Sequence, residues 1–285
     1  MSKKEENKKE NPLLKKDTNS YLNKIIAIAS QKGGVGKTTT AVNLSSFLNS
    51  FGYKTILIDF DPQSNATSAF GFIPEEIKTT VYSLIIYNED PNKAIMETPY
   101  PGLKIIPSTR QLAGAEVEMV TVFKREFRLK DAIQKIEEQY DFIIIDCPPS
   151  LGLLTINALA ACKDVIIPIQ NSYFSLEGVA QLLNTIDLVK MSLNSKLEVK
   201  GVLFTMYSRS RLAEGIYNDL KNNFGSKLYN TIIPKNVRLD EASSHGKPVF
   251  YYDQGCKGAK AYKDFSLEVL KSYIDTNSSD TDIPL

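Results

Sequence analysis

The run Gln31-Lys32-Gly33-Gly34-Val35-Gly36-Lys37-Thr38-Thr39-Thr40 lies between a short apolar segment and an amphipathic one. Residues 24–30 have the pattern of a buried parallel strand, and residues 39–51 place apolar side chains near helical spacing. The glycines let backbone N–H groups converge on an anion, and the positive end of the following helix points to the same place. The pattern therefore predicts a strand, a phosphate-binding loop and a helix.

Side chains in this loop have the chemistry that a nucleoside triphosphate requires. Lys37 would supply positive charge to the β- and γ-phosphates, and the Thr38 hydroxyl would be a ligand of Mg²⁺. The general P-loop pattern has glycine where Gln31 stands, and Lys32 is an additional lysine. A glycine-rich turn with a solvated lysine is the alternative interpretation. The remaining residues expected around the phosphates are Gly33, Gly34, Val35, Gly36 and Thr39.

Two further apolar runs end in carboxylates. Residues 54–59 end at Asp59, with Asp61 two positions later, and residues 142–146 end at Asp146. Ligands of open parallel sheets bind beyond the carboxyl ends of the strands, so these acids should face the same crevice as the loop. Asp146 has the Walker B pattern, and it would hold the water shell of Mg²⁺ opposite Thr38. The alternative for the first two acids is capping of a helix.

The rest of the chain alternates between strand and helix patterns. Strands are expected at residues 103–107, 164–169 and 199–206, and near 232–234. Helices are expected at residues 78–96, 108–120, 125–139 and 259–274, and from Ser175 onward. We predict an α/β fold with a doubly wound, mostly parallel sheet flanked by helices. Residues 21–275 would form one domain, with a disordered tail at 1–20 and a flexible tail at 276–285.

Composition narrows the class of protein. With 285 residues and 42% hydrophobic content, the chain can bury a large core. A formal net charge of +1 excludes a globally basic nucleic-acid binder, so any DNA contact would need a local patch. The three cysteines form no C-x-x-C pair, which favours a reducing compartment. We expect a cytoplasmic protein, because no apolar run reaches membrane-spanning length.

The K-G-G-x-G-K-T loop resembles the deviant P-loop of the ParA/MinD group of ATPases. The resemblance extends from Lys24 to about Leu270 and is closest to small ParA/Soj partition ATPases. Its motifs are QKGGVGKTTTAVNL, LIDFDPQSNAT, FIIIDCPPSLGLLTINAL, FSLEGVAQLL and IPKNVRLDEASSHGKPV. It implies a slow ATPase that uses ATP and Mg²⁺, dimerises on ATP, binds double-stranded DNA non-specifically at the nucleoid, and is released by a ParB-like partner.

The resemblance also implies roles for individual residues. Lys32 would reach into the partner subunit's site, and Asp61 would orient the attacking water. Pro234 and Asn236 would lie near the adenine, with Asp59 in the same crevice. We expect DNA contacts from the basic residues that flank the late strands, although a solvated basic face is the alternative. They are Arg209, Arg211, Lys235, Arg238 and Lys247.

Three other functions remain open at this point. A MinD-like regulator of cell division would need a basic amphipathic C-terminal helix, whereas residues 277–285 are acidic and polar. An iron–sulfur ATPase would need paired thiolates, and Cys147 directly follows Asp146 instead. A nucleotide-gated DNA-binding switch with little turnover would share most of these motifs. His245 is interpreted as a loop residue, because phosphoryl transfer does not need a histidine base.

Overall fold

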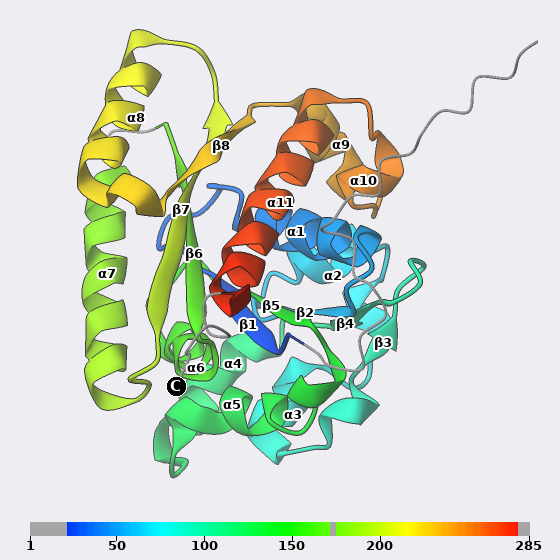
Figure 1. The fold of residues 1–285 in the computed structure, drawn as a ribbon. Coiled ribbons are helices and arrows are strands. Elements are labelled where there is room, and N and C mark those ends of the chain that lie inside the picture. Colours follow the sequence, from blue (N-terminus) through cyan, green and yellow to red (C-terminus); the bar gives the residue numbers. More distant parts are fainter. Residues whose placement is uncertain (1–21, 172–174, 279–285) are drawn as a thin grey trace, which may run out of the picture.

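A single eight-stranded sheet organises the part of the chain that the computed structural model describes, residues 22–171 and 175–278 (Figure 1). Its strand order is β3-β4-β2-β5-β1-β6-β7-β8. All neighbouring strands are parallel except β3, which pairs antiparallel with β4. The strands are β1 Lys24–Ile28, β2 Thr55–Asp59, β3 Met96–Glu97, β4 Leu103–Ile106, β5 Phe142–Asp146, β6 Asp164–Gln170, β7 Glu198–Tyr207 and β8 Leu228–Pro234.

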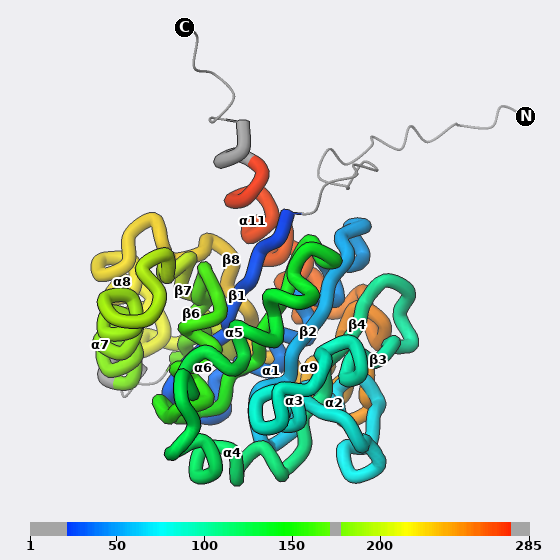
Figure 2. Tube along the Cα trace, turned by 90° about the horizontal axis from the view of Figure 1, so that it is seen from below, coloured from blue at the N-terminus to red at the C-terminus, as the bar shows by residue number. Residues whose placement is uncertain are grey.

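Helices cover both faces of this sheet (Figure 2). Helices α1, α2, α9, α10 and α11 bury their apolar side chains in the cluster on one face, and α3 to α8 do so on the other. The helices are α1 Lys37–Ser50, α2 Asn65–Ala69, α3 Val81–Tyr87, α4 Leu112–Glu118, α5 Arg128–Ile133, α6 Leu153–Ala161, α7 Ser175–Ser192, α8 Arg211–Phe224, α9 Val237–Ser244, α10 Val249–Tyr252 and α11 Lys257–Ser278. Short 3₁₀ turns are η1 Pro74–Glu76, η2 Pro91–Lys93, η3 Met119–Thr121, η4 Arg125–Phe127, η5 Glu137–Gln139 and η6 Gly225–Lys227.

The central strands are apolar along their whole length because both of their faces are covered. In β1, Ile26 and Ile28 belong to the cluster under α1 and α11, whereas Ala27 belongs to the opposite cluster. Strand β5 alternates in the same way. Successive side chains of a strand point to opposite faces, so a sheet with two helical layers needs continuous apolar runs. The expected doubly wound, mostly parallel sheet is thus confirmed.

Several helical segments differ from the sequence-based expectation. The helix expected at 78–96 is only α3, which ends where Asn88 adopts a left-handed backbone conformation with φ of 53°. The helix expected at 125–139 is divided into η4, α5 and η5. Helix α11 extends beyond the expected end at residue 274 and reaches Ser278. Tertiary packing decides these boundaries, and hydrophobic spacing alone does not show them.

Helices α2, α6, α8, α9 and α10 and the two-residue strand β3 were not predicted. Helix α8 has a regular apolar stripe that the sequence interpretation overlooked: Ala213, Ile216 and Leu220 are buried, and Tyr217 and Phe224 pack against the core. Its start is marked by Ser210, whose side chain accepts a hydrogen bond from the amide of Ala213. The predicted tails fall almost entirely outside the described residues. Within the described ranges, no helix is long and apolar enough to cross a membrane.

Candidate nucleotide-binding site

The loop between β1 and α1 has the backbone that its glycines were expected to allow. Gly34 and Gly36 have φ values of 71° and 85°, in the left-handed region that other residues rarely adopt. Gly36 directly precedes α1 and provides no side-chain cap, so the first N–H groups of the helix face the loop. The sequence therefore folds here into an anion cradle at a helix N-terminus.

A core contact holds the tip of this loop. The side chain of Val35 is only 1% exposed. Its carbonyl oxygen accepts a hydrogen bond of 2.8 Å from the Thr205 hydroxyl, which also lies 3.2 Å from the carbonyl of Ile169. Thr205 belongs to β7, so the loop is tied to β6 and β7 as well as to its own strand. The sequence did not reveal this threonine, because 170 residues separate the two partners.

Lys37 is buried and lies beside carboxylates. Its ammonium nitrogen donates a hydrogen bond of 3.0 Å to the carbonyl of Lys32, which closes the loop. Burial lowers the pKa of Lys37, and the negative charges of Asp146 and Asp61 oppose this effect. The ammonium group is therefore held at the site in an environment where an additional anion would stabilise its charge.

The first two predicted acids have different environments. Asp59 is fully buried, and its carboxylate accepts hydrogen bonds of 2.7 Å from both the amide and the hydroxyl of Thr67. The Thr67 hydroxyl in turn accepts from the amide of Ser108. Burial raises the pKa of Asp59 to about 7 even though these hydrogen bonds oppose the rise. Asp59 thus fastens α2 to the ends of β2 and β4, and it is not among the side chains that line the cavity described below.

Asp61 faces the cavity. Its carboxylate accepts a hydrogen bond of 2.9 Å from the amide of Gln63, which shapes the turn before α2. Burial raises the pKa of Asp61, and the Gln63 hydrogen bond and the Lys37 charge oppose the rise. The N-cap position of α2 is Ser64, so Asp61 does not cap that helix. A carboxylate that stays at the cavity wall is available to a water molecule there.

Asp146 lies next to Asp59 across the pairing of β2 and β5. It is fully buried, and neither carboxylate oxygen has a hydrogen-bond donor at bonding geometry among the described residues. Burial raises its pKa well above the ordinary value, with a contribution from Asp59, while the Thr38 side chain and Lys37 favour the charged form. A buried carboxylate without donors is costly unless a cation neutralises it.

Magnesium fits this environment. Within the described residues there is no group of three His, Cys, Asp or Glu side chains that could hold a metal ion alone. Nucleotide-bound Mg²⁺ does not need one, because it takes phosphate oxygens, water and one or two protein oxygens. Thr38 and Asp146 would hold the ion, and the ion would supply positive charge to the phosphates. The donor set therefore suits a Mg²⁺–nucleotide complex.

Two adjoining cavities match the parts of a nucleotide. The larger, of about 530 Å³, is lined by the phosphate loop, by Asp61 and by residues of α2 and α9. The smaller, of about 70 Å³, is lined by apolar and polar residues from the ends of β7 and β8, α9 and α11. Gly36, Thr39, Met206 and Asp240 line both. The larger cavity is suited to phosphates and the smaller one to a base.

Most of the predicted site residues meet at these cavities. Gly33, Gly34, Gly36, Lys37, Thr38, Thr39 and Asp61 line the larger cavity, and Pro234 and Asn236 line the smaller one. Lys32, Val35, Asp59 and Asp146 lie beside or beneath them and do not line either. Sequence reasoning missed Thr67, Met206, Asp240, Ser243 and Ser244. A signal for α9 existed in Asn236, whose side chain caps the helix by accepting from the amide of Arg238.

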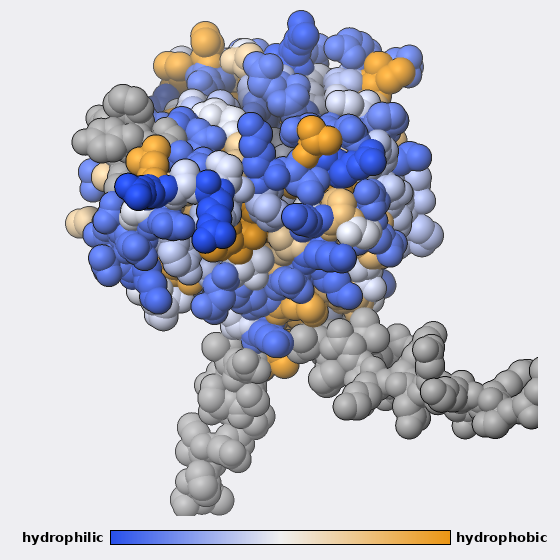
Figure 3. Space-filling view, turned by 90° about the horizontal axis from the view of Figure 1, so that it is seen from above, coloured by the Kyte–Doolittle hydropathy of each residue, from blue (hydrophilic) through white to orange (hydrophobic). Residues whose placement is uncertain are grey.

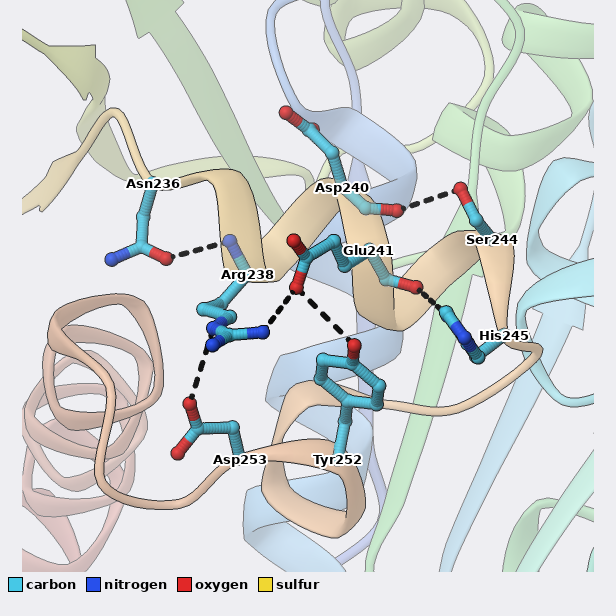
Figure 4. Close-up of polar contacts among 8 residues, drawn as sticks. All are labelled: Asn236, Arg238, Asp240, Glu241, Ser244, His245, Tyr252 and Asp253. Carbon is cyan, nitrogen blue, oxygen red and sulfur yellow. Dashed lines mark hydrogen bonds and ion pairs between the residues drawn. The ribbon is translucent and has the colours of Figure 1, made fainter.

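The predicted DNA-contacting residues are all exposed, but they have different surroundings. Arg209 and Arg211 lie where the chain leaves β7 and begins α8. Lys235 also lines the base cavity. Arg238 forms ion pairs of 2.6 Å with Glu241 and 3.7 Å with Asp253, and its side chain remains 52% exposed (Figure 4).

Lys247 lies just beyond α9, and His245 follows the last residue of that helix, as expected for a loop position. Its Nδ1 lies 2.8 Å from the carbonyl of Glu241. On the face shown in Figure 3, hydrophilic residues predominate and hydrophobic ones are scattered.

Comparisons with known proteins agree with this site. Residues 23–199 match the family model described as an AAA domain. The sporulation initiation inhibitor protein Soj of Bacillus subtilis is 50% identical over 249 residues, 87% of this chain and 98% of that protein. The chromosome partitioning protein ParA of Myxococcus xanthus is 46% identical over 249 residues, 87% of this chain and 88% of that protein.

A solved structure has a similar fold. Cobyrinic acid a,c-diamide synthase from Mycobacterium smegmatis, solved with bound ADP and magnesium, has a TM-score of 0.78 at 33% identity. The match covers 89% of this chain and 96% of that one.

The fold and the site together define a P-loop nucleotide-binding protein built on a doubly wound sheet. Its glycine-rich loop, its buried lysine and its strand-end aspartates come from β1, β2 and β5, which are neighbours in the sheet. The two bacterial proteins each align with 87% of this chain. The chain belongs to the ParA/Soj family of chromosome-partitioning ATPases.

Proposed function

We propose that this protein is a Mg²⁺-dependent ATPase that acts as a DNA-partition switch. The observation that carries the proposal is the convergence of Lys37, Thr38 and Asp61 on one cavity, with the fully buried carboxylate of Asp146 beneath it. ATP would place its phosphates in the loop and its base in the smaller cavity. Phosphoryl transfer to water needs positioning and charge stabilisation, and these residues supply both.

Each residue has a separate part in the proposed reaction. Lys37 and the loop amides hold the phosphates, and Thr38 with Asp146 holds Mg²⁺. Asp61 orients the attacking water, because its carboxylate stays at the cavity wall and is not required for capping α2. Slow basal turnover is expected in this family, since a switch must persist in its ATP state before the partner acts.

DNA binding and release complete the proposed cycle. The ATP-bound dimer would bind double-stranded DNA without sequence preference through exposed basic residues, among them Arg209, Arg211 and Lys247. Phosphate-dominated binding needs positive charge and no base contacts. A ParB-like partner would then accelerate hydrolysis and release the protein, which would be found on the nucleoid in the cytoplasm. Membership of the ParA/Soj family supports this cycle.

Three alternative functions would use the same nucleotide site. A MinD-like regulator would differ in having a basic amphipathic C-terminal helix. Most of the acidic and polar segment 277–285 lies outside the described residues. A nucleotide-gated switch with little turnover would bind ATP as well but would not need Asp61 at the cavity. An iron–sulfur role is not favoured, because Cys147 and Cys162 are fully buried in the core rather than paired at the surface.

The decisive experiment compares three proteins: the wild type, Lys37→Ala and Asp61→Ala. Lys37→Ala should lose ATP binding, because the main cation at the phosphates is gone. Asp61→Ala should bind ATP and DNA with near-normal affinity but hydrolyse ATP about 100-fold more slowly, since only water orientation is lost. The measurements are ATP affinity, phosphate release with Mg²⁺, and retention on DNA after addition of the ParB-like protein.

Asp264→Ala, an exposed change on α11, is the matched control and should behave like the wild type. Normal phosphate release by Asp61→Ala would refute the hydrolytic role of Asp61. Unchanged ATP affinity in Lys37→Ala would refute the nucleotide site itself.

A further inference from the structure

The sugar of a bound nucleotide has a defined place in this protein. Phosphates belong to the larger cavity and the base to the smaller one, as argued above. Among the residues that the structure describes, four line both cavities, namely Gly36, Thr39, Met206 and Asp240. Because the ribose connects the α-phosphate to the base, the residues shared by the two cavities surround the position of the ribose.

Among these four residues, only Asp240 carries a charge. It lies in the first turn of α9, and its backbone carbonyl accepts a hydrogen bond of 3.0 Å from the Ser244 hydroxyl. No hydrogen bond or ion pair occupies its carboxylate among the residues that the structure describes. The carboxylate is exposed and keeps all of its acceptor capacity for a molecule in the cavities.

Helix α9 holds Asp240 in a fixed orientation. On the opposite side of the helix, Arg238 pairs with Glu241 at 2.6 Å and with Asp253 at 3.7 Å, and Tyr252 donates to Glu241 at 3.2 Å. Figure 4 shows that the carboxylate of Asp240 points away from this cluster. Leu239 and Ala242 of α9 are buried in the core, so the helix is held with Asp240 on the wall of both cavities.

We propose that Asp240 selects the sugar of the nucleotide by accepting a hydrogen bond from a ribose hydroxyl. A carboxylate beside the ribose is a recurrent way to recognise this hydroxyl in nucleotide sites. The proposal rests on the proposed function, because it assumes that ATP binds with its phosphates in the loop. It adds discrimination between ribonucleotides and deoxyribonucleotides, which the phosphate loop cannot provide.

The competing explanation is electrostatic and local. An acidic residue in the first turn of a helix stabilises the helix dipole and can remain solvated. In that case Asp240 would influence ATP and its deoxy analogues equally. Its negative charge near the phosphates would weaken the binding of all of them, and removing the charge would strengthen all of them by the same factor.

The test measures equilibrium affinities for ATP, 2′-deoxyATP and 3′-deoxyATP with Mg²⁺ by calorimetry. The wild type should prefer ATP to at least one deoxy analogue by about tenfold, a typical effect of one hydrogen bond to a charged group. Asp240→Ala should bring this ratio close to one. Asp240→Asn keeps an acceptor oxygen and should retain part of the preference. Asp219→Asn, an exposed change on α8, is the control and should keep the full ratio.

Each other outcome counts against the inference. Three outcomes overturn this inference but leave the proposed function intact. They are an unchanged ratio in Asp240→Ala, a uniform gain in affinity for all three nucleotides, and a wild type without any preference. A wild type that binds no adenine nucleotide overturns the proposed function and this inference with it. If thermal melting shows that Asp240→Ala does not fold, Asp240→Asn replaces it in the test. A reduced preference for ATP in Asp240→Asn supports the inference, and an unchanged preference overturns it.

Discussion

Single residues distant in sequence complete the phosphate loop. The Thr205 hydroxyl bonds the carbonyls of Val35 and Ile169, so one side chain joins the loop to β6 and β7. If this buried hydroxyl is removed, water cannot replace the hydrogen bonds that the two carbonyls lose. The geometry of the loop therefore depends on a residue that lies far from the P-loop motif in the sequence.

Replacing Thr205 by valine should weaken nucleotide binding. Thr205→Val keeps the shape but removes the hydroxyl, which should cost about 1–2 kcal/mol of stability and lower ATP affinity several-fold. Thr205→Ser should retain both. Thr55→Val is the control: this buried hydroxyl bonds the carbonyl of Tyr53 at the start of β2, so its loss should affect stability only. Titration calorimetry and thermal melting measure the two effects, and equal ATP affinities in both valine variants would contradict the proposed anchoring.

The raised pKa of Asp59 predicts how stability depends on pH. Its folded pKa of about 7 exceeds the ordinary value of 3.8, so the folded state binds this proton more tightly than the unfolded state. The protonated Asp59 therefore contributes fully to stability below about pH 4, and this contribution is lost as the pH rises through about 7. The nucleotide-free protein should therefore melt at a lower temperature at pH 8 than at pH 5.

Asp59→Asn should flatten this dependence, because asparagine does not titrate. Part of the slope should remain, since the pKa of the neighbouring Asp146 is also raised. Calorimetric melting of both proteins from pH 5 to 8 measures the difference. The exposed change Asp264→Asn should leave the slope as in the wild type. Parallel melting curves for wild type and Asp59→Asn would show that Asp59 is ionised throughout this range.

At the scale of elements, two helices meet behind the cavity through glycines. Gly71, after α2, and Gly246, after α9, both have left-handed backbone conformations, with φ of 83° and 61°. A Cβ atom on Gly246 would lie 2.7 Å from the Cα of Gly71, whereas one on Gly71 would lie 3.4 Å from the carbonyl oxygen of Gly246. Since α2 and α9 both contribute to the larger cavity, this contact sets its width.

Gly246→Ala should therefore separate α2 from α9. We expect a loss of about 1–3 kcal/mol in stability, together with slower ATP hydrolysis, because the walls of the cavity move apart. Gly71→Ala is the matched control. It introduces the same kind of backbone strain, but its Cβ would lie at van der Waals distance from the carbonyl oxygen of Gly246. It should lose stability and keep more of its activity. Chemical denaturation and phosphate release measure both properties, and equal hydrolysis rates in the two variants would contradict the argument.

The sequence predicted the central elements better than the peripheral ones. Strands β1, β2 and β5 are buried on both faces, and their apolar runs ending at functional residues leave little ambiguity. The two residues of β3 carry no such pattern, and neither does α9 with its polar surface. The same division applies to the site. Lys37, Asp61 and Asp146 follow recognisable strands, whereas Thr205 and Asp240 reach the cavities only through tertiary packing.

For the molecule as a whole, we predict that ATP drives dimerisation through Lys32. Lys32 lies in the loop beside the cavity, and its carbonyl already receives a hydrogen bond from Lys37. A lysine that extends across a subunit boundary neutralises phosphate charge only when both subunits are present. The family resemblance assigns this role to Lys32.

Lys32→Ala should bind ATP as a monomer. The loop amides and Lys37 remain, so ATP affinity per chain should fall only several-fold, whereas ATP-dependent dimerisation should be lost. Light scattering with Mg²⁺ and ATP measures the mass in solution. Lys263→Ala, an exposed lysine on α11, should dimerise like the wild type. If Lys32→Ala forms dimers at the same ATP concentration as the wild type, Lys32 does not connect the two subunits.

The strand order has a consequence for how the chain acquires its activity during synthesis. Strand β1 pairs only with β5 and β6, although β2 follows it directly in the sequence. The ribosome must therefore produce residues 142–146 before the first strand has any hydrogen-bonded neighbour, and closing so long a loop is slow. Until then the glycine-rich loop has no fixed strand behind it, and Asp146 does not yet exist. The cavities also need residues of β7, β8 and α9, so a nascent chain completes its nucleotide site only after residue 244 has been made.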